Sequence, residues 1–119
     1  MTGTDRALLP PAGAIAVIFI SQRTDEDAEG YGMAAATMEV LAATQPGYLG
    51  IDAARDGDGF GITVSYWADE ASALAWRANA EHAAVRALGR ARWYAHYRMI
   101  VTRIARAYAW RGDGAPPAG

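Results

Sequence analysis

The residues of this sequence that are best suited to chemistry gather in its second half. His82 is flanked by Asn79 and Arg86, and Trp76 precedes all three. Histidine changes its protonation near neutral pH, so it can accept a proton from an organic molecule. An asparagine amide, an indole N–H or a tyrosine hydroxyl can donate a hydrogen bond to an oxygen on which negative charge develops. Further candidates for ligand contact are Tyr66, Trp67, Trp93, Tyr94 and His96.

The helical spacing of these residues sets a condition on any shared site. On an ideal helix, His82 lies about 60° from Asn79 and about 40° from Arg86 around the axis. Trp76 lies about 120° from His82 by the same measure. Trp76 and His82 therefore face one pocket only if the helix bends near residues 79–80, or if the pocket wraps around the helix.

Each candidate also has a purely structural interpretation. His82 fits a hydrogen-bonded histidine at the edge of the core, and Trp76 fits packing between a helix and a sheet. The remaining aromatic candidates and the second histidine fit the core, a linker or a subunit interface in the same way: Tyr66, Trp67, Trp93, Tyr94 and His96. The residue types alone leave both interpretations open.

The composition excludes several classes of chemistry. The 119 residues fit one domain and contain neither cysteine nor lysine. Thiolate nucleophiles, disulfides, iron–sulfur clusters and lysine Schiff bases therefore have no residue to use. Two separated histidines without a carboxylate cluster make a poor metal site. We expect neither a metal nor a cofactor.

Charge and hydropathy limit the partners. No apolar run reaches the length of a membrane span, and the first residues do not have the form of a signal peptide, so we expect a cytoplasmic protein that contacts no membrane. A net charge of −2 argues against nucleic acid. Within residues 66–110, however, seven arginines face three acidic residues. This excess fits solvated faces and subunit pairing or, alternatively, a pocket wall that favours an anionic ligand.

Hydropathy and turn residues predict elements in the order β-α-β-β-α-β. The predicted strands span residues 14–22, 48–55, 60–67 and 97–110. The chain is expected to divide into a flexible N-terminal arm, one folded domain and a disordered tail, which are residues 1–13, 14–110 and 111–119.

Two helices complete this order. The first is expected to begin after Thr24 as N-cap and to run to about Thr44, with Met33 and Val40 on its apolar face. The second is expected to run without interruption over 70–88. The order is that of a ferredoxin-like α+β fold with an antiparallel sheet and both helices on one face. The other face would be bare in a monomer, so we expect a homodimer in which two sheets pair into a barrel.

Short segments of the sequence resemble the antibiotic biosynthesis monooxygenase (ABM) family of dimeric α+β-barrel proteins. The resemblance covers about residues 14–110. It rests on the order and spacing of GYLG at 47–50, ITVSYW at 62–67, AW at 75–76, EH at 81–82 and GRARWYAHY at 89–97. It implies a pocket between the helices and the sheet of each subunit. Some members of the family oxygenate polyketide quinone precursors without a cofactor.

The resemblance gives the candidate residues specific roles. A cofactor-independent monooxygenase would act on a small aromatic, quinol-type molecule with O2, His82 would be the base, and Asn79 and Trp76 would orient the substrate. The haem-degrading branch is disfavoured, because Arg86 stands where that branch has its axial histidine, and the first strand has no asparagine. The alternatives are a non-catalytic protein that binds or protects a small molecule, and a small isomerase or decarboxylase.

Overall fold

The fold consists of one four-stranded sheet with helices packed on it. The computed structural model describes residues 9–112 in the order β-α-β-β-α-α-β, which confirms the predicted ferredoxin-like class. The strands are β1 (Ile15–Arg23), β2 (Tyr48–Arg55), β3 (Phe60–Trp67) and β4 (Tyr94–Arg103). The helices are α1 (Ala28–Ala43), α2 (Glu70–Ala78) and α3 (Ala80–Leu88), followed by a π-helical turn, η1 (Gly89–Trp93).

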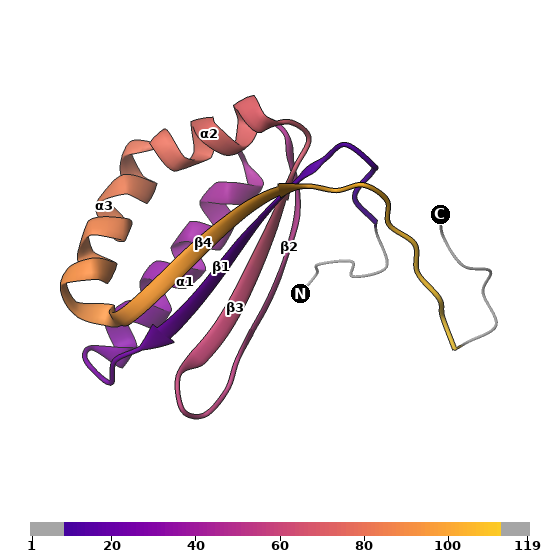
Figure 1. The fold of residues 1–119 in the computed structure, drawn as a ribbon. Coiled ribbons are helices and arrows are strands. Elements are labelled where there is room, and N and C mark those ends of the chain that lie inside the picture. Colours follow the sequence, from indigo (N-terminus) through magenta and orange to yellow (C-terminus); the bar gives the residue numbers. More distant parts are fainter. Residues whose placement is uncertain (1–8, 113–119) are drawn as a thin grey trace.

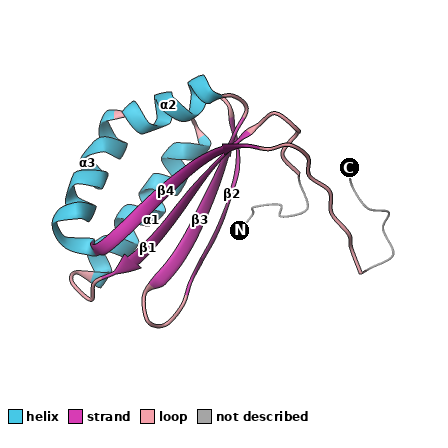
Figure 2. Ribbon diagram, viewed as in Figure 1, coloured by secondary structure: helices cyan, strands magenta, loops and turns pink. Residues whose placement is uncertain are grey.

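The sheet is antiparallel throughout, with strand order β2-β3-β1-β4. Ile18 at the centre of β1 lies opposite Val64 of β3 and Ile100 of β4. Because side chains alternate along a strand, Val17 and the other odd-numbered residues of β1 face the opposite way to Ile18. Figures 1 and 2 show α1 behind the sheet and α2 and α3 along its upper edge, with the strands open toward the viewer.

Helix α1 begins three residues later than predicted. Its N-cap is Asp27, whose carboxylate accepts a hydrogen bond from the Gly30 amide at 3.2 Å. Thr24 does not cap the helix, because its hydroxyl donates to the Arg92 carbonyl at 2.7 Å and accepts from the Glu26 amide at 3.2 Å. The predicted cap residue therefore joins the turn before α1 to η1.

The apolar face predicted for α1 was also wrong. Met33 and Val40 are 66% and 70% exposed, whereas Ala42 is buried in the core. The rotation of the helix is fixed near its start, where the Tyr31 hydroxyl accepts a hydrogen bond from Arg55 of β2 at 3.1 Å. This contact turns Tyr31 and the alanines toward the sheet and leaves the larger aliphatic side chains outside.

The predicted second helix is broken in two. Asn79 has φ −56° and ψ 131°, so α2 ends there and α3 begins in a new direction. Its side-chain oxygen accepts from the amides of Glu81 at 3.0 Å and His82 at 3.2 Å. Asparagine is among the preferred N-cap residues, and capping of α3 compensates for the interruption. The bend therefore lies where a shared site for Trp76 and His82 requires one.

The last strand is shifted relative to its prediction, spanning 94–103 instead of 97–110. Gly89 keeps right-handed helical angles, with φ −59°, and the chain continues into η1 before it turns into β4. Arg103 lies opposite Ile15, the first residue of β1, and the strand ends there. The predictions for 1–8 and 113–119 lie outside the described residues. None of the helices in residues 9–112 is long and apolar enough to cross a membrane.

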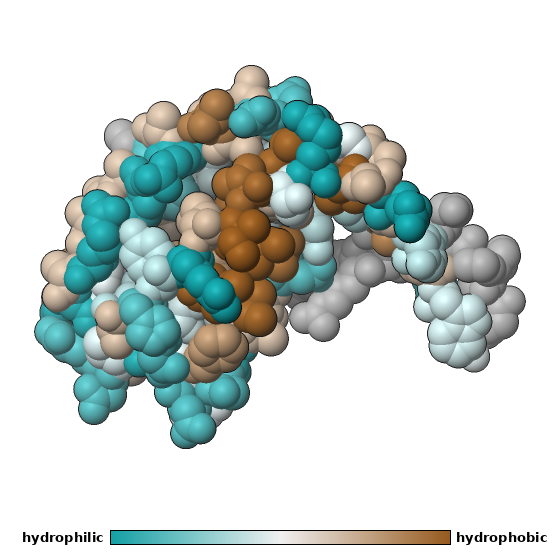
Figure 3. Space-filling view, viewed as in Figure 1, coloured by the Kyte–Doolittle hydropathy of each residue, from teal (hydrophilic) through white to brown (hydrophobic). Residues whose placement is uncertain are grey.

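The two faces of the sheet differ in what covers them. The helix-facing side carries the buried core around Ile15, Trp67, Ala42 and Ala73. The opposite side carries a patch of aliphatic and aromatic side chains that no described element covers. In this patch Phe60, Ile62 and Ile100 are 41%, 42% and 44% exposed. Figure 3 shows brown, apolar surface along the middle of the strands.

Candidate functional site

A cavity of about 630 Å³ lies between the helices and the helix-facing side of the sheet. Its helical wall contains several alanines, whose small side chains leave space above the strands: Ala34, Ala35, Ala42 and Ala73. The sheet contributes a mixed floor of Val17, Phe19, Thr63, Ser65, Met99 and Val101. The volume and the mostly apolar lining are typical of a site for a small organic molecule.

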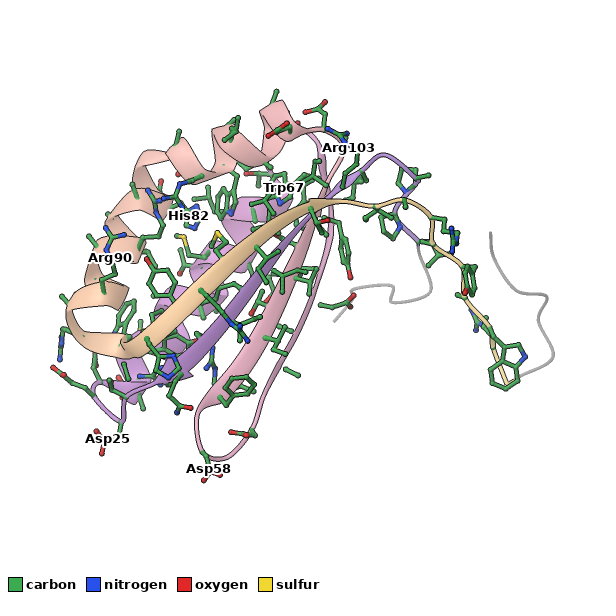
Figure 4. The ribbon with its side chains drawn as sticks, in the orientation of Figure 1. Asp25, Asp58, Trp67, His82, Arg90 and Arg103 are labelled. Carbon is green, nitrogen blue, oxygen red and sulfur yellow. The ribbon has the colours of Figure 1, made fainter. Side chains whose placement is uncertain are left out.

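Three aromatic rings stack at one end of this cavity. Trp67 is fully buried, and its ring lies 5.9 Å from that of Trp76 at an angle of 24°. The ring of Trp76 lies 4.3 Å from the imidazole of His82 at 17°. Figure 4 shows Trp67 beneath α2 and His82 projecting from α3 toward the sheet. The bend at Asn79 brings together the two side chains that a straight helix would hold apart.

The hydrogen bonding of His82 defines its basic nitrogen. His82 Nδ1 lies 2.9 Å from the Trp76 carbonyl oxygen, which can only accept, so Nδ1 carries the proton and Nε2 has a free lone pair. Burial lowers the pKa of His82 below its ordinary value of 6.5, and the nearby Arg86 and Arg77 lower it further, although the bond to Trp76 opposes them. At neutral pH the side chain is therefore an uncharged base on the cavity wall.

Arg86 lies one turn after His82 and also lines the cavity. Its Nε is the one buried side-chain nitrogen or oxygen without a hydrogen-bond partner among the described residues. Burial lowers the pKa of Arg86, and the neighbouring Arg77 and Arg90 lower it further. A guanidinium keeps its charge in proteins at neutral pH, so this end of the cavity combines a neutral base with an unpaired cation.

A second polar group lies at the other end of the strands. Arg55 donates to the Ser21 hydroxyl at 2.8 Å and to the Tyr31 hydroxyl at 3.1 Å. The Arg23 guanidinium lies 3.9 Å from the centre of the Tyr31 ring. Burial, followed by a hydrogen bond to Tyr31, raises the pKa of Tyr94. These groups satisfy one another and hold α1 against the sheet.

The register of the sheet separates Trp67, behind the aromatic stack, from the group around Arg55. Trp67 lies opposite Ile15 at the start of β1, whereas Arg55 reaches Ser21 six positions further along the same strand. At ~3.3 Å per residue, six positions correspond to ~20 Å of strand. The aromatic stack and the Arg55 group therefore lie toward different ends of the sheet, and α3 runs from the stack toward Tyr97, which lies opposite Ser21 and accepts from Arg90.

Five of the residues singled out from the sequence line the cavity: Trp76, His82, Arg86, Trp93 and Tyr94. Trp93 is 3% exposed and donates from its indole nitrogen to Asp27 at 3.2 Å. Tyr94 packs edge-on against Tyr31 at 5.8 Å. The structure thus brings together residues from α2, α3, η1 and β4.

The other four candidates lie outside the lining. Trp67 is behind Trp76, with its indole nitrogen donating to Ser65 at 3.0 Å. The side chain of Asn79 caps α3. Tyr66 lies on the opposite face of the sheet, where its hydroxyl donates to Asp52 at 3.0 Å. His96 is exposed, opposite Gln22, on that same face.

Tyr31 and Arg55 are lining residues that were not predicted from the sequence. A signal for Arg55 was present, because it alternates with Ile51 and Ala53 on one side of β2. A charged residue on the buried side of a strand needs partners and marks a special site. Nothing in the local sequence pointed to Tyr31, since its role depends on the rotation of α1. Within 9–112 no group of three or more metal-binding side chains occurs.

The fold and the cavity define a ferredoxin-like α+β protein with a cavity between its helices and its sheet. The profile of the Antibiotic biosynthesis monooxygenase family matches residues 14–88, so the chain belongs to this family. It is 45% identical over 91 residues to the uncharacterised protein YqjZ of Bacillus subtilis, an alignment that covers 76% of this chain and 79% of YqjZ.

Solved structures share the fold. One is SnoaB, a cofactor-independent oxygenase from Streptomyces nogalater, with a TM-score of 0.69 and 15% identity over 81% of this chain and 97% of SnoaB. Another is a putative antibiotic biosynthesis monooxygenase from Nitrosomonas europaea, with a TM-score of 0.68 and 13% identity over 81% of this chain and 94% of that chain. At these identities the likeness concerns the fold.

Proposed function

We propose that this protein is a cofactor-independent monooxygenase that oxidises a small, flat quinol- or anthrone-type molecule with O2. The observation that carries the proposal is the neutral His82 stacked on Trp76 at the wall of a cavity large enough for such a molecule. Membership of the monooxygenase family and the fold shared with SnoaB support the reaction class.

The proposed reaction balances without an external reductant. His82 Nε2 removes a proton from an activated CH2 group, and the resulting carbanion transfers electrons to O2. The carbon and oxygen combine to a peroxide anion, which takes back the proton to give a hydroperoxide. The hydroperoxide then loses water to leave a ketone. The substrate CH2 is oxidised to C=O, one oxygen atom enters the product, and the other leaves as water.

The residues around His82 have distinct proposed roles. Trp76 provides a flat surface against which an aromatic substrate can lie, and the stack also fixes the plane of the imidazole. Asn79, whose side chain caps α3, is a positioning residue that sets the direction of His82. Trp93 and Tyr94 form part of the wall toward the second polar group. An apolar cavity excludes water from the carbanion.

The test is oxygen uptake by the purified, metal-free protein with anthrones, naphthols and hydroquinones. We expect uptake by the wild type and a loss of about 10²- to 10⁴-fold in His82→Ala. His96→Ala is the matched control, because His96 is exposed on the opposite face of the sheet and should leave the rate unchanged. Equal rates in wild type and His82→Ala would remove His82 from the mechanism.

We also propose that the active form is a homodimer and that it is located in the cytoplasm. An apolar patch lies on the outer face of the sheet and includes Ile62 and Ile100. A second copy of the chain would bury this patch, which supports the dimer. Sedimentation analysis should give the mass of two chains, and Ile62→Glu should yield monomers. A wild type that sediments as a monomer would exclude the dimer.

One observation favours a second candidate function. The part of the helical wall that contains Ala34, Ala35, Ala42 and Ala73 offers shape but no side-chain hydrogen bonds to a ligand. A non-catalytic protein that binds or protects a small molecule would need no more than this. Binding of the test compounds without oxygen uptake would support that function over the oxygenase.

A further inference from the structure

The Arg86 side chain differs from the other described polar side chains in its hydrogen bonding. Its Nε is buried without a hydrogen-bond partner, and no carboxylate lies within ion-pair distance of it in the described part of the chain. Buried polar atoms are nearly always paired, because an unpaired group loses its hydration without compensation. An exception on the wall of a ligand-sized cavity points to a partner that comes from outside the protein.

Other positively charged side chains lie near Arg86. Arg77 also lines the cavity, and Arg90, which donates to the Tyr97 hydroxyl at 3.3 Å, follows Arg86 by one turn. The neighbouring His82 on the same helix is neutral at pH 7 and adds no negative charge. Arg86 therefore has two further cations near it, and no carboxylate pairs with it among the described residues.

The acidic residues of the cavity do not neutralise Arg86. The lining contains two carboxylates, Glu39 and Glu70. Glu70 lies 4.0 Å from Arg103, and neither carboxylate forms an ion pair with Arg86. Arg55, a further cation of the lining, already donates hydrogen bonds to the Ser21 and Tyr31 hydroxyls. Arg77 is exposed to solvent, so Arg86, with its buried and unpartnered Nε, is the arginine best placed to bind an anion in the cavity.

We propose that the substrate is an aromatic anion whose carboxylate or phenolate oxygen binds the Arg86 guanidinium beside His82. The proposal rests on the proposed function, in that it takes the cavity as the substrate site. It narrows the substrate from flat aromatic molecules in general to those that carry a negatively charged oxygen at one edge. Because His82 lies one turn away on the same helix, the acidic C–H would be close to that edge.

The test compares two ligands of equal shape, 2-naphthoate and 2-naphthamide, by titration calorimetry at pH 7.5. We expect the wild type to bind the carboxylate about 10- to 100-fold more tightly than the neutral amide, as for a charge-assisted hydrogen bond. Arg86→Gln should lose this preference, and Arg86→Lys should keep part of it. Arg106→Gln removes the same charge outside the cavity and should bind like the wild type.

Three outcomes would overturn the proposal: equal affinity for the two ligands, a preference that persists in Arg86→Gln, or no binding of either ligand. Circular dichroism checks that each variant folds, and Arg86→Lys provides the comparison if Arg86→Gln does not. The readout is binding, so it is independent of turnover. An Arg86-dependent preference without oxygen uptake would refute the oxygenase and leave this inference standing, whereas uptake without the preference would do the reverse.

Discussion

Two arginines line the same cavity under opposite conditions. Arg55 donates to Ser21 and Tyr31, and its Nη1 lies 3.4 Å from the Ser21 carbonyl. Arg86 Nε has no hydrogen-bond partner in the described residues, and Arg77 and Arg90 act on its guanidinium as neighbouring cations. The hydrogen bonding of Arg55 is thus complete without a ligand, whereas Arg86 lacks an anion.

This difference separates structural from functional charge. A guanidinium with all its partners in place contributes to stability, because its removal leaves several acceptors unpaired. A guanidinium without partners contributes little or destabilises the fold. We infer that Arg55 was retained for the architecture of the cavity and Arg86 for its ligand.

Replacement of Arg55 should have the largest effect on stability. Arg55→Met leaves Ser21 and Tyr31 without their donor, so we expect a loss of about 3 kcal/mol in the free energy of unfolding. Urea unfolding at one protein concentration measures it. Arg106→Met is the control, since Arg106 is exposed. If the Arg55→Met protein is as stable as this control, Arg55 contributes no more to stability than an unpaired arginine does.

Loss of the cap between α2 and α3 should have an intermediate effect. Asn79→Ala removes the acceptor for the Glu81 and His82 amides, which should cost about 1 kcal/mol. It should also loosen the stack of His82 on Trp76 and lower turnover, whereas Asn79→Asp should retain both properties. If Asn79→Ala has normal stability and turnover, the bend does not depend on this side chain.

The buried His82 should make the protein sensitive to acid. Because its pKa in the folded state is below 6.5, the unfolded chain binds a proton first as the pH falls. Stability from this group is complete above pH 6.5 and is lost as the pH falls from there toward the folded pKa. Urea unfolding at pH 7.5 and pH 5 should show a larger decrease for wild type than for His82→Gln. Turnover should remain constant down to pH 6.5. A rate that already falls between pH 8 and pH 7 would contradict a neutral His82.

The smallest effect is expected at Arg86. Arg86→Met removes an unpaired cation and its repulsion with Arg77 and Arg90, so the free energy of unfolding should stay within about 0.5 kcal/mol of wild type or rise. The same urea series measures it beside Arg55→Met. A loss as large as that of Arg55→Met would reveal a structural partner and weaken the case for a ligand anion.

Much of the fold could be predicted because its signals are local. The strands at 48–55 and 60–67 lie where alternation and the turn between them placed them. The predictions failed where a distant contact decided the outcome. The Thr24 hydroxyl donates to the Arg92 carbonyl instead of capping α1. The rotation of α1 follows from the contact between Tyr31 and Arg55.

The candidate site was predictable only in part for the same reason. His82, Trp76 and Arg86 could be named from residue type and helical spacing, and each lines the cavity. Tyr66 and Trp67 have the same chemistry, yet strand parity and packing direct them elsewhere. Residue type shows what a side chain can do, but not which face of an element will enclose a ligand.

The sequence by itself determined the order of the strands, the helical segments between them and the absence of cysteine and lysine chemistry. Those properties follow from composition and from periodicities of two and 3.6 residues. The tertiary structure alone decided that the helix breaks at Asn79, that His82 stacks on Trp76, and that Arg55 is paired while Arg86 is not. Each depends on contacts between elements far apart in the chain, which no local pattern contains.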